Sequence, residues 1–162
     1  ESKLKWPNDI LIDGKKVSGV LVDASVNSRS IESVIVGIGV NVNVNSAEVQ
    51  SDIKCQTFPI QVTSLSDELA APCDKVRLIK NILQTLDKYY LKIESDTDYP
   101  LLKQWKHRAD DITSKPVHVS HGAEGFTATV VGLEEDGSLV VARDNNRIER
   151  LVSAEYSIRF IA

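Results

Sequence analysis

The stretch KWPNDILIDGKKVSG (residues 5–19) decides how the chain begins to fold. Asp13-Gly14 in its middle is a strong signal for a two-residue hairpin turn, because both positions tolerate a positive φ angle. The segments on either side, DILI (9–12) and KVSGVLVDASV (16–26), are rich in β-branched residues. The pattern predicts two antiparallel strands joined by a tight turn.

The same stretch concentrates polar side chains. Lys5, Asn8 and Asp9 precede or begin the first strand, and Pro7 stiffens its entry. The turn brings Lys5 and Asp9 towards the same end of the hairpin, while Lys16 projects from the part of the hairpin nearest the turn. Two ammonium groups, an amide and a carboxylate suit a phosphate-bearing ligand with a metal. The alternative is an exposed hairpin whose lysines are only solvated, since surface lysines are common.

A second apolar segment, IESVIVGIGVNVNVN (31–45), follows the hairpin. Its first part predicts a strand covered on both faces, and the alternation of Val and Asn in its tail predicts a strand with one polar side. Gly37 and Gly39 remove side chains where a ligand can approach closely, and Asn41 offers both a donor and an acceptor. A bulge followed by a turn-capping Asn explains the same residues. The glycines are not a dinucleotide fingerprint, because no helix follows them.

Helical periodicity dominates the middle of the chain. A short helical turn is expected at 66–71, a long helix at 74–94 with Asp74 as its N-cap, and a third helix near Tyr99 that carries Trp105.

From Val117 onward the chain reads as five short strands separated by turn residues, which suggests a small SH3-like β-barrel. The change of pattern lies at 110–116. The expected fold is therefore α+β, with a first portion of strands and helices over 1–112 and a small barrel domain over 113–162.

Composition excludes several classes of function. The 162 residues include 42% hydrophobic and 26% charged residues, and the formal net charge is −4. An acidic chain without a block of Lys or Arg argues against nucleic acid as a partner, and no apolar run is long enough to span a membrane. Cys55 and Cys73 lack zinc-ligand spacing and read as thiols of a reducing cytoplasm. The three histidines are expected to be surface or turn residues: His107, His118 and His121.

Taken together, the motifs resemble the biotin protein ligase family. KWPND, GKKVSG and GIGVN match the second half of its catalytic domain, TSL (63–65) and the helices continue the match, and the tail EDGSLVV…RLVSAEYSIR is similar to its small C-terminal barrel. The resemblance runs from about residue 4 to residue 160. It implies a partial, mixed or antiparallel sheet with packed helices, as in a class II synthetase-like core, and an enzyme that makes biotinyl-adenylate from biotin and ATP. That enzyme then moves biotin to a lysine of a carboxyl carrier domain.

The resemblance also assigns roles. Lys16 matches the lysine that contacts the biotin carboxylate and the α-phosphate, where a fixed cation offsets developing negative charge. Asp9 matches a residue near the incoming acceptor lysine, where it orients the amine or takes up its proton. Gly19 would leave room for biotin. The residues implied on the nucleotide side are Lys5, Asn8, Gly37, Gly39, Asn41 and Arg159.

The implied substrates and metal are ATP, biotin and Mg²⁺, with no protein residue assigned as a metal ligand. Arg159 and Glu155 match a tail segment that faces the catalytic domain in some members, although Ala154 stands where the family more often has Gly. The family's GRGRxxR adenylate loop lies before KWPND and is not among these residues. Together with the absence of Met and a start at Glu1, this predicts a fragment whose N-terminal half is disordered, cleaved or a separate chain.

Two further functions fit the sequence. The chain is alternatively a non-catalytic nucleotide-binding or docking module, or a relative of the lipoate ligases, which share the fold but usually lack KWPN. The strand that follows Gly19 is a candidate for pairing with a second copy of the chain, as in a homodimer.

Overall fold

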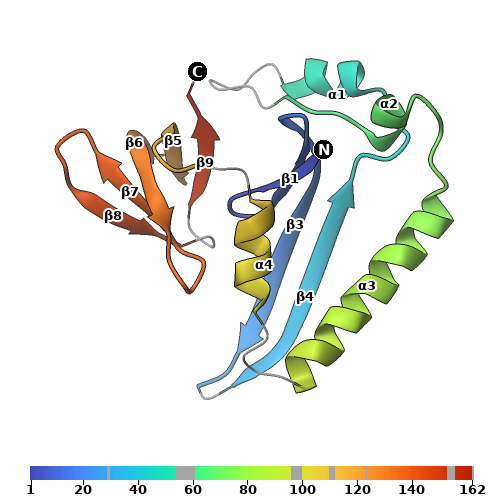
Figure 1. Cartoon of the computed structure of the whole chain (residues 1–162), viewed down its shortest axis with the longest axis horizontal. Coiled ribbons are helices and arrows are strands. Elements are labelled where there is room, and N and C mark those ends of the chain that lie inside the picture. The colour runs from blue at the N-terminus through green and yellow to red at the C-terminus, as the bar shows by residue number, and fades with distance from the viewer. Residues whose placement is uncertain are drawn as a thin grey trace.

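The computed structural model of the protein describes residues 1–28, 30–53, 61–95, 100–109, 112–122, 124–152 and 156–161. These residues form two antiparallel sheets and four helices, an α+β arrangement that confirms the expected fold class (Figure 1). No helix in the described part of the chain is long and apolar enough to cross a membrane.

The first sheet contains β1 (Ser2–Lys5), β2 (Asp9–Ile12), β3 (Lys15–Val26) and β4 (Ile31–Val40), paired in that order. The predicted hairpin is confirmed, because Asp13 and Gly14 turn the chain between β2 and β3 with φ angles of 47° and 78°. Strand β1 was not predicted. It pairs with β2 so that Lys5 lies directly opposite Asp9.

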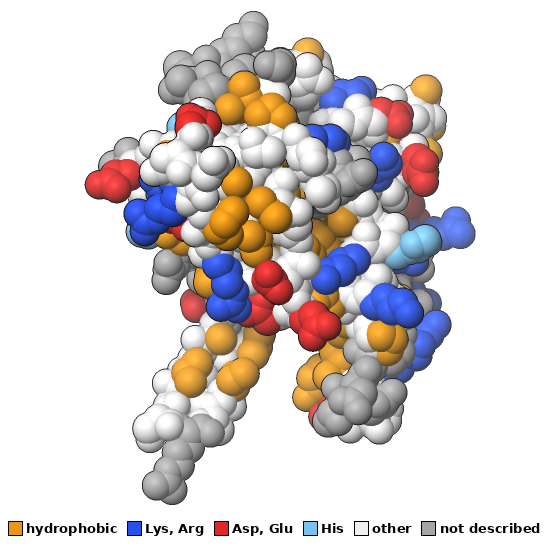
Figure 2. Space-filling model, turned by 60° about the vertical axis from the view of Figure 1, so that its left-hand side comes forward, with side chains coloured by type: hydrophobic (Ala, Val, Ile, Leu, Met, Phe, Trp, Pro, Cys, Tyr) orange, Lys and Arg blue, Asp and Glu red, His pale blue; other side chains and the backbone are white. Residues whose placement is uncertain are grey.

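The prediction that the first part of residues 31–45 forms a strand covered on both faces is wrong. Residues 31–39 of β4 are exposed, because α3 (Lys75–Ser95) stands away from β4 across an open groove of about 390 Å³. Figure 2 shows hydrophobic side chains on the two parts of the molecule that project at the bottom of the view.

The Val–Asn tail does not continue the strand, contrary to the prediction. β4 ends at Val40 because the asparagines bond to nearby or facing backbone instead of extending a ladder. The Asn43 side chain accepts a hydrogen bond from the Cys73 amide at 2.8 Å and donates one to the Cys73 carbonyl at 2.9 Å. Asn45 accepts a hydrogen bond from the Ala47 amide at the start of α1 (Ser46–Ile53), a helix that was not predicted.

The other helices follow the predictions closely. They are α2 (Leu65–Leu69), α3 and α4 (Leu101–Arg108). Asp74 is confirmed as the N-cap of α3, since its carboxylate accepts hydrogen bonds from the amides of Val76 and Arg77 at 2.9 and 3.1 Å. Helix α4 lies beside β1, where Ala109 pairs with Leu4.

The second sheet has the order β8-β7-β6-β5-β9. Its strands are β5 (Pro116–His121), β6 (Glu124–Leu133), β7 (Leu139–Arg143), β8 (Ile148–Leu151) and β9 (Ser157–Phe160), which confirms the five predicted strands. Gly122, Gly137 and Asn146 have positive φ angles at the predicted turns. Closure of this sheet into a barrel stays a prediction.

The main core lies between the second sheet and the start of the chain. Trp6 is 2% exposed and packs with Ile112 among buried side chains of the second sheet, such as Val117 and Leu139. Its indole nitrogen donates a hydrogen bond to the Gly137 carbonyl at 2.9 Å. The predicted division between 1–112 and 113–162 stays a prediction, and this core crosses it.

Candidate functional site

An open pocket of about 470 Å³ forms where β2, β3 and β4 lie side by side. Six of the residues singled out in the sequence line it, and three apolar residues complete it: Asn8, Asp9, Lys16, Gly19, Gly37, Gly39, Val20, Leu21 and Ile38. The structure thus brings together the KWPND, GKKVSG and GIGVN motifs. Lys5, Asn41 and Arg159 do not line this pocket.

Strand register explains the meeting of these motifs. Asp9 pairs with Gly19 across β2 and β3, and Gly19 pairs with Gly39 across β3 and β4. Paired residues share one face of a sheet, so the two glycines leave the space beside Asp9 open.

A β-bulge decides which lysine faces the pocket. Ile10 pairs with Ser18 and Leu11 pairs with Lys16, so Val17 is the extra residue on β3. The extra residue places Lys16 and Gly19 on the same side of the sheet, although their spacing would otherwise put them on opposite sides. Lys16 therefore reaches Asp9, which sequence reasoning did not anticipate.

Asp9 lies between two ammonium groups. Its side chain is 10% exposed, and its carboxylate oxygens lie 2.5 Å from the Lys16 Nζ and 3.5 Å from the Lys5 Nζ. The Lys16 side chain is 32% exposed and faces the pocket, whereas that of Lys5 is 11% exposed. The Lys5 ammonium also donates a hydrogen bond to the Ile158 carbonyl at 3.0 Å. Burial lowers the pKa of Lys5 below its ordinary value of 10.5, and the nearby Asp9 carboxylate opposes that shift.

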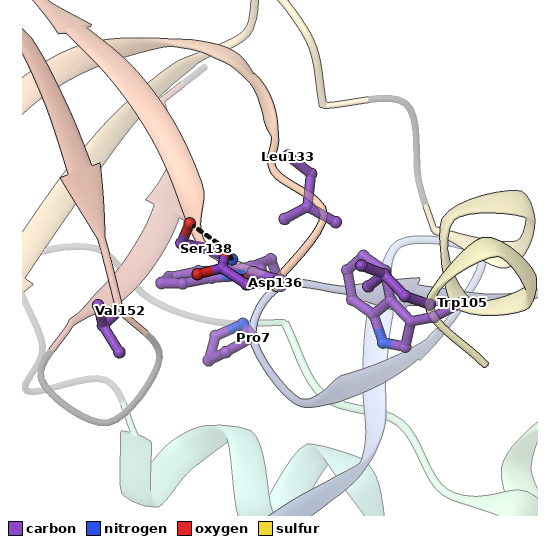
Figure 3. A pocket seen from close by; sticks show the side chains of 9 residues that line it. Pro7, Trp105, Leu133, Asp136, Ser138 and Val152 are labelled. Carbon is purple, nitrogen blue, oxygen red and sulfur yellow. Dashed lines mark hydrogen bonds between the residues drawn. The ribbon is translucent and has the colours of Figure 1, made fainter. Parts of the chain in front are cut away.

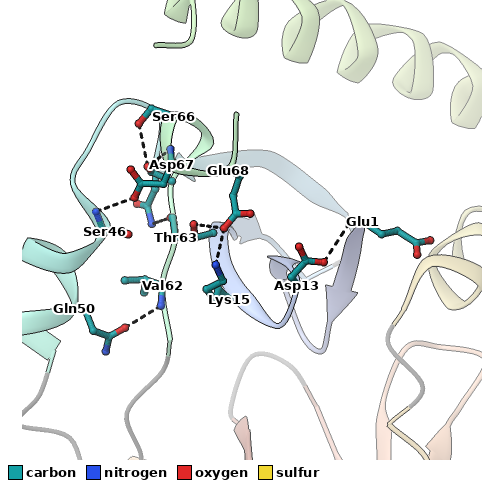
Figure 4. A network of polar contacts seen from close by, with 12 residues as sticks. Glu1, Asp13, Lys15, Ser46, Gln50, Val62, Thr63, Ser66, Asp67 and Glu68 are labelled. Carbon is teal, nitrogen blue, oxygen red and sulfur yellow. Dashed lines mark hydrogen bonds and ion pairs between the residues drawn. The ribbon is translucent and has the colours of Figure 1, made fainter. Parts of the chain in front are cut away.

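A second polar network involves Lys15, the neighbour of Lys16 on β3 (Figure 4). On the other side of β3, the Lys15 ammonium lies 2.8 Å from Glu68 Oε1, and the Thr63 hydroxyl donates to the same oxygen at 2.6 Å. These bonds lower the pKa of Glu68 and raise that of Lys15. The backbone amide of Lys16 donates to the Gln61 carbonyl at 2.8 Å, and the Thr63 amide donates to the Lys16 carbonyl at 2.9 Å. Only TSL (63–65) hinted at this segment, and nothing in the sequence linked Glu68 to Lys15.

The two asparagines are held by backbone groups. Asn8 donates its side-chain amide to the Val20 carbonyl at the pocket rim. The Asn41 amide donates to the Thr63 carbonyl at 3.0 Å, a contact between distant segments and not a local turn cap. Contact of either residue with a nucleotide stays a prediction.

The last strand of the second sheet, β9, lies close to Lys5. Arg159 lies in β9 opposite His118, and its positive charge helps to lower the pKa of Lys5. Glu155 and Ala154 lie outside the described residues.

A second pocket, of about 250 Å³, borders the KWPND segment on its other side (Figure 3). Trp6 and Pro7 form one wall, Trp105 of α4 lies across from them, and the turn at Asp136 closes the pocket. Asp136 accepts a hydrogen bond from the Ser138 hydroxyl at 2.6 Å. This pocket shows how α4 and the second sheet together hold the residues that precede Asp9, and the sequence did not predict it.

Other sequence candidates stay outside the site. No group of three or more His, Cys, Asp and Glu side chains able to hold a metal occurs within the described ranges. His121 is the last residue of β5 and is exposed, as expected for a surface residue, and its ring packs on Tyr156 with centroids 4.7 Å apart. Cys73 is a free thiol, and Cys55 lies outside the described residues.

Comparison with known proteins gives a consistent picture. Residues 1–41 match the model of the biotin/lipoate A/B protein ligase family. The chain is 30% identical over 159 residues to the bifunctional ligase/repressor BirA of Bacillus subtilis, covering 98% of the chain and 46% of that protein. It is 24% identical to a biotin–[acetyl-CoA-carboxylase] ligase of Paracoccus denitrificans, covering 85% of the chain and 55% of that protein. The chain thus spans about half the length of the curated relatives it matches.

Solved structures match both sheets. Biotin protein ligase from Aquifex aeolicus aligns without ligand with a TM-score of 0.77 and 26% identity, over 99% of this chain and 66% of that one. The same enzyme in complex with biotin and ATP aligns with a TM-score of 0.73 and 27% identity, over 99% of this chain and 62% of that one.

Substitution of Gly19 tests whether the space beside Asp9 matters. An added methyl group would lie 3.2 Å from the Lys16 Nζ and 3.3 Å from an Asp9 carboxylate oxygen, so both groups must shift. If the full-length protein forms an acyl-adenylate, as proposed below, Gly19→Ala should slow that step about tenfold, because small misplacements of reacting groups are costly. Gly132→Ala is the control, since nothing lies within 4 Å of a methyl group there. Equal rates for the two variants in a pyrophosphate-release assay would contradict this reading of the pocket.

Proposed function

We infer that this chain, whose sequence and fold match the biotin protein ligase family, forms part of an enzyme that activates biotin with ATP and attaches it to a protein lysine. The acceptor in this proposal is a carboxyl carrier domain, and the Paracoccus relative is named as a ligase that acts on acetyl-CoA carboxylase. The observation that carries the proposal is the Lys16–Asp9 pair beside a pocket with glycine walls.

The first step joins two anions. The biotin carboxylate attacks the α-phosphorus of ATP, a bond to the α-phosphate forms, and pyrophosphate leaves. Negative charge gathers on the phosphoryl oxygens. The ammonium group of Lys16, which is the more exposed partner of the Lys16–Asp9 ion pair, supplies a cation that stabilises this charge. Gly19 beside Lys16 leaves room for biotin, so Lys16 and Gly19 form the biotin side of the site.

The second step uses a nucleophile from the acceptor protein. The lysine amine attacks the acyl carbon of the adenylate, AMP leaves, and the amine loses a proton. Asp9 orients this amine or takes up its proton, since its carboxylate lies at the pocket where both substrates meet.

The nucleotide side consists of residues around the pocket and next to it. Asn8, Gly37 and Gly39 line the pocket, whereas Asn41 and Arg159 act from outside its lining. Mg²⁺ enters with the ATP phosphates, which are its usual ligands in nucleotide-dependent enzymes. The enzyme works in the cytoplasm, with a second copy of the chain as a further partner, paired along the part of β3 that follows Gly19 and that β2 does not cover.

The alternative substrate is lipoate, because the matched family model includes lipoate ligases. The Paracoccus relative and the solved structures described above are biotin ligases by name, which favours biotin. The test is exchange of labelled pyrophosphate into ATP by the full-length protein, with biotin or lipoate added. Exchange with biotin alone supports the proposal. Exchange with lipoate alone would overturn the proposal in favour of a lipoate ligase. Exchange with neither acid would overturn it in favour of a non-catalytic docking module.

The 162-residue chain by itself should release pyrophosphate far more slowly than the full-length protein. The described pocket is open, and water that reaches the reacting groups weakens the electrostatic stabilisation of the transition state. Comparison of the two proteins at equal active concentration, with biotin and ATP saturating, tests this. Comparable turnover would show that these residues form a self-sufficient site.

A further inference from the structure

The buried ammonium group of Lys5 is placed to control the neighbouring cation. We propose that Lys5 is a positioning residue, which balances Asp9 from the buried side so that Lys16 is released to bind an anionic substrate. This inference rests on the proposed function and differs from direct nucleotide contact by Lys5.

The geometry separates the two lysines into an inner and an outer cation. Lys5 is 9% exposed and does not line the pocket, so its ammonium faces the protein instead of a ligand. Lys16 is more exposed and lines the pocket, and both ammonium groups approach the carboxylate of Asp9. One carboxylate thus serves two cations, and only the outer cation reaches the site.

The two ammonium groups around Asp9 allow one of them to leave without exposing an unpaired buried charge. When a substrate carboxylate or phosphate draws Lys16 away, Asp9 stays paired with Lys5. Without Lys5, departure of Lys16 would leave a buried carboxylate unpaired, which is strongly unfavourable. Lys16 would then stay locked on Asp9 and would stabilise the transition state less well.

The second sheet fixes the inner cation. Lys5 donates to the main-chain carbonyl of Ile158, which is 2% exposed and lies in β9. Strand β9 is held by its pairing with β5, where Ile158 lies opposite Val119. The last strand of the second sheet therefore contributes to the site through a backbone oxygen.

The experiment compares substitutions at the inner lysine in the full-length protein. Lys5→Met keeps the length of the stem without the charge, Lys5→Arg keeps the charge, and Lys15→Met is the matched control on the opposite side of the sheet. The measurement is the kcat and KM of biotin-dependent pyrophosphate exchange. We expect Lys5→Met to lower kcat about 10–100-fold, the usual range for loss of a group that orients a reactive one. Lys5→Arg should recover most of the rate, and Lys15→Met should change it by less than about threefold.

A purely structural role predicts something else: a lower melting temperature with an unchanged kcat below it. A folded Lys5→Met protein with the kcat of the wild type therefore overturns the proposal. So does a Lys5→Arg protein as slow as Lys5→Met, since packing of the stem would then set the rate. If Lys5→Met does not fold, Lys5→Gln retains a donor for the Ile158 carbonyl without the charge. Failure of both neutral variants to fold also refutes a separable positioning role. Absence of biotin-dependent exchange in the wild type would instead refute the proposed function.

Discussion

Replacement of Lys16 by alanine in the full-length protein should lower the rate of adenylate formation by about 10²–10³-fold, the usual loss for one transition-state contact. Lys16 is the pocket-lining cation, and its ammonium carries the charge that the reacting phosphate and carboxylate need. Folding should change little, because Asp9 keeps Lys5 as a partner. The measurement is pyrophosphate release at saturating biotin and ATP.

Lys15→Ala is the control for this experiment. Its side chain leaves the opposite side of β3 and pairs with Glu68, so its loss should be mild. Equal loss of rate in the two variants would mean that the bulge in β3 does not separate the roles of the two lysines.

Asp9→Ala should destabilise the folded full-length protein by about 3–5 kcal/mol, the usual result of removing one partner from a buried ion pair. The substitution leaves the two ammonium groups close together, and that of Lys5 is buried. Urea unfolding followed by circular dichroism measures the change. Glu149→Ala is the matched control, because it removes the partner of the more exposed Arg143 and should cost clearly less.

The pH dependence of this loss identifies Lys5 as its source. The pKa of Lys5 is lowered in the folded protein, mainly by burial, so the unfolded chain binds its proton more tightly. Stability from this group is therefore lost as the pH falls through the folded-state pKa and is regained as the pH rises towards 10.5. The deficit of Asp9→Ala should shrink as the pH approaches that value. A deficit that stays constant would assign the loss to packing.

Local signals in the sequence were sufficient for the elements and for part of the site. Asp13-Gly14 predicted the hairpin because few residue pairs adopt two positive φ angles, and the glycines of GIGVN predicted an open space beside a strand. The resemblance of the motifs to a known family added the roles of Lys16 and Asp9, which spacing alone did not provide.

The remaining features depend on contacts between distant segments. The bulge at Val17 determines the direction of Lys16, yet Val in a strand gives no local sign of an extra residue. Glu68 meets Lys15 because residues 61–63, which precede α2, pair with Lys16 of β3, and an apolar run such as that of β4 looks the same whether or not another element covers it. The alternation of Val and Asn around Asn43 was wrongly taken as a strand. The same alternation arises when asparagine side chains bond to the backbone of a loop.

The contact between Lys5 and the Ile158 carbonyl has a consequence for genetics. A main-chain oxygen is present whatever residue occupies position 158, so a substitution there acts through the packing of the buried Ile158 side chain and does not remove the acceptor of this hydrogen bond. An in-frame insertion or deletion in the tail acts differently, because it shifts the register of the last strand and reverses the face of every following side chain. An insertion or deletion in the tail can therefore move the carbonyl that Lys5 uses, whereas a substitution at position 158 leaves that carbonyl in the chain.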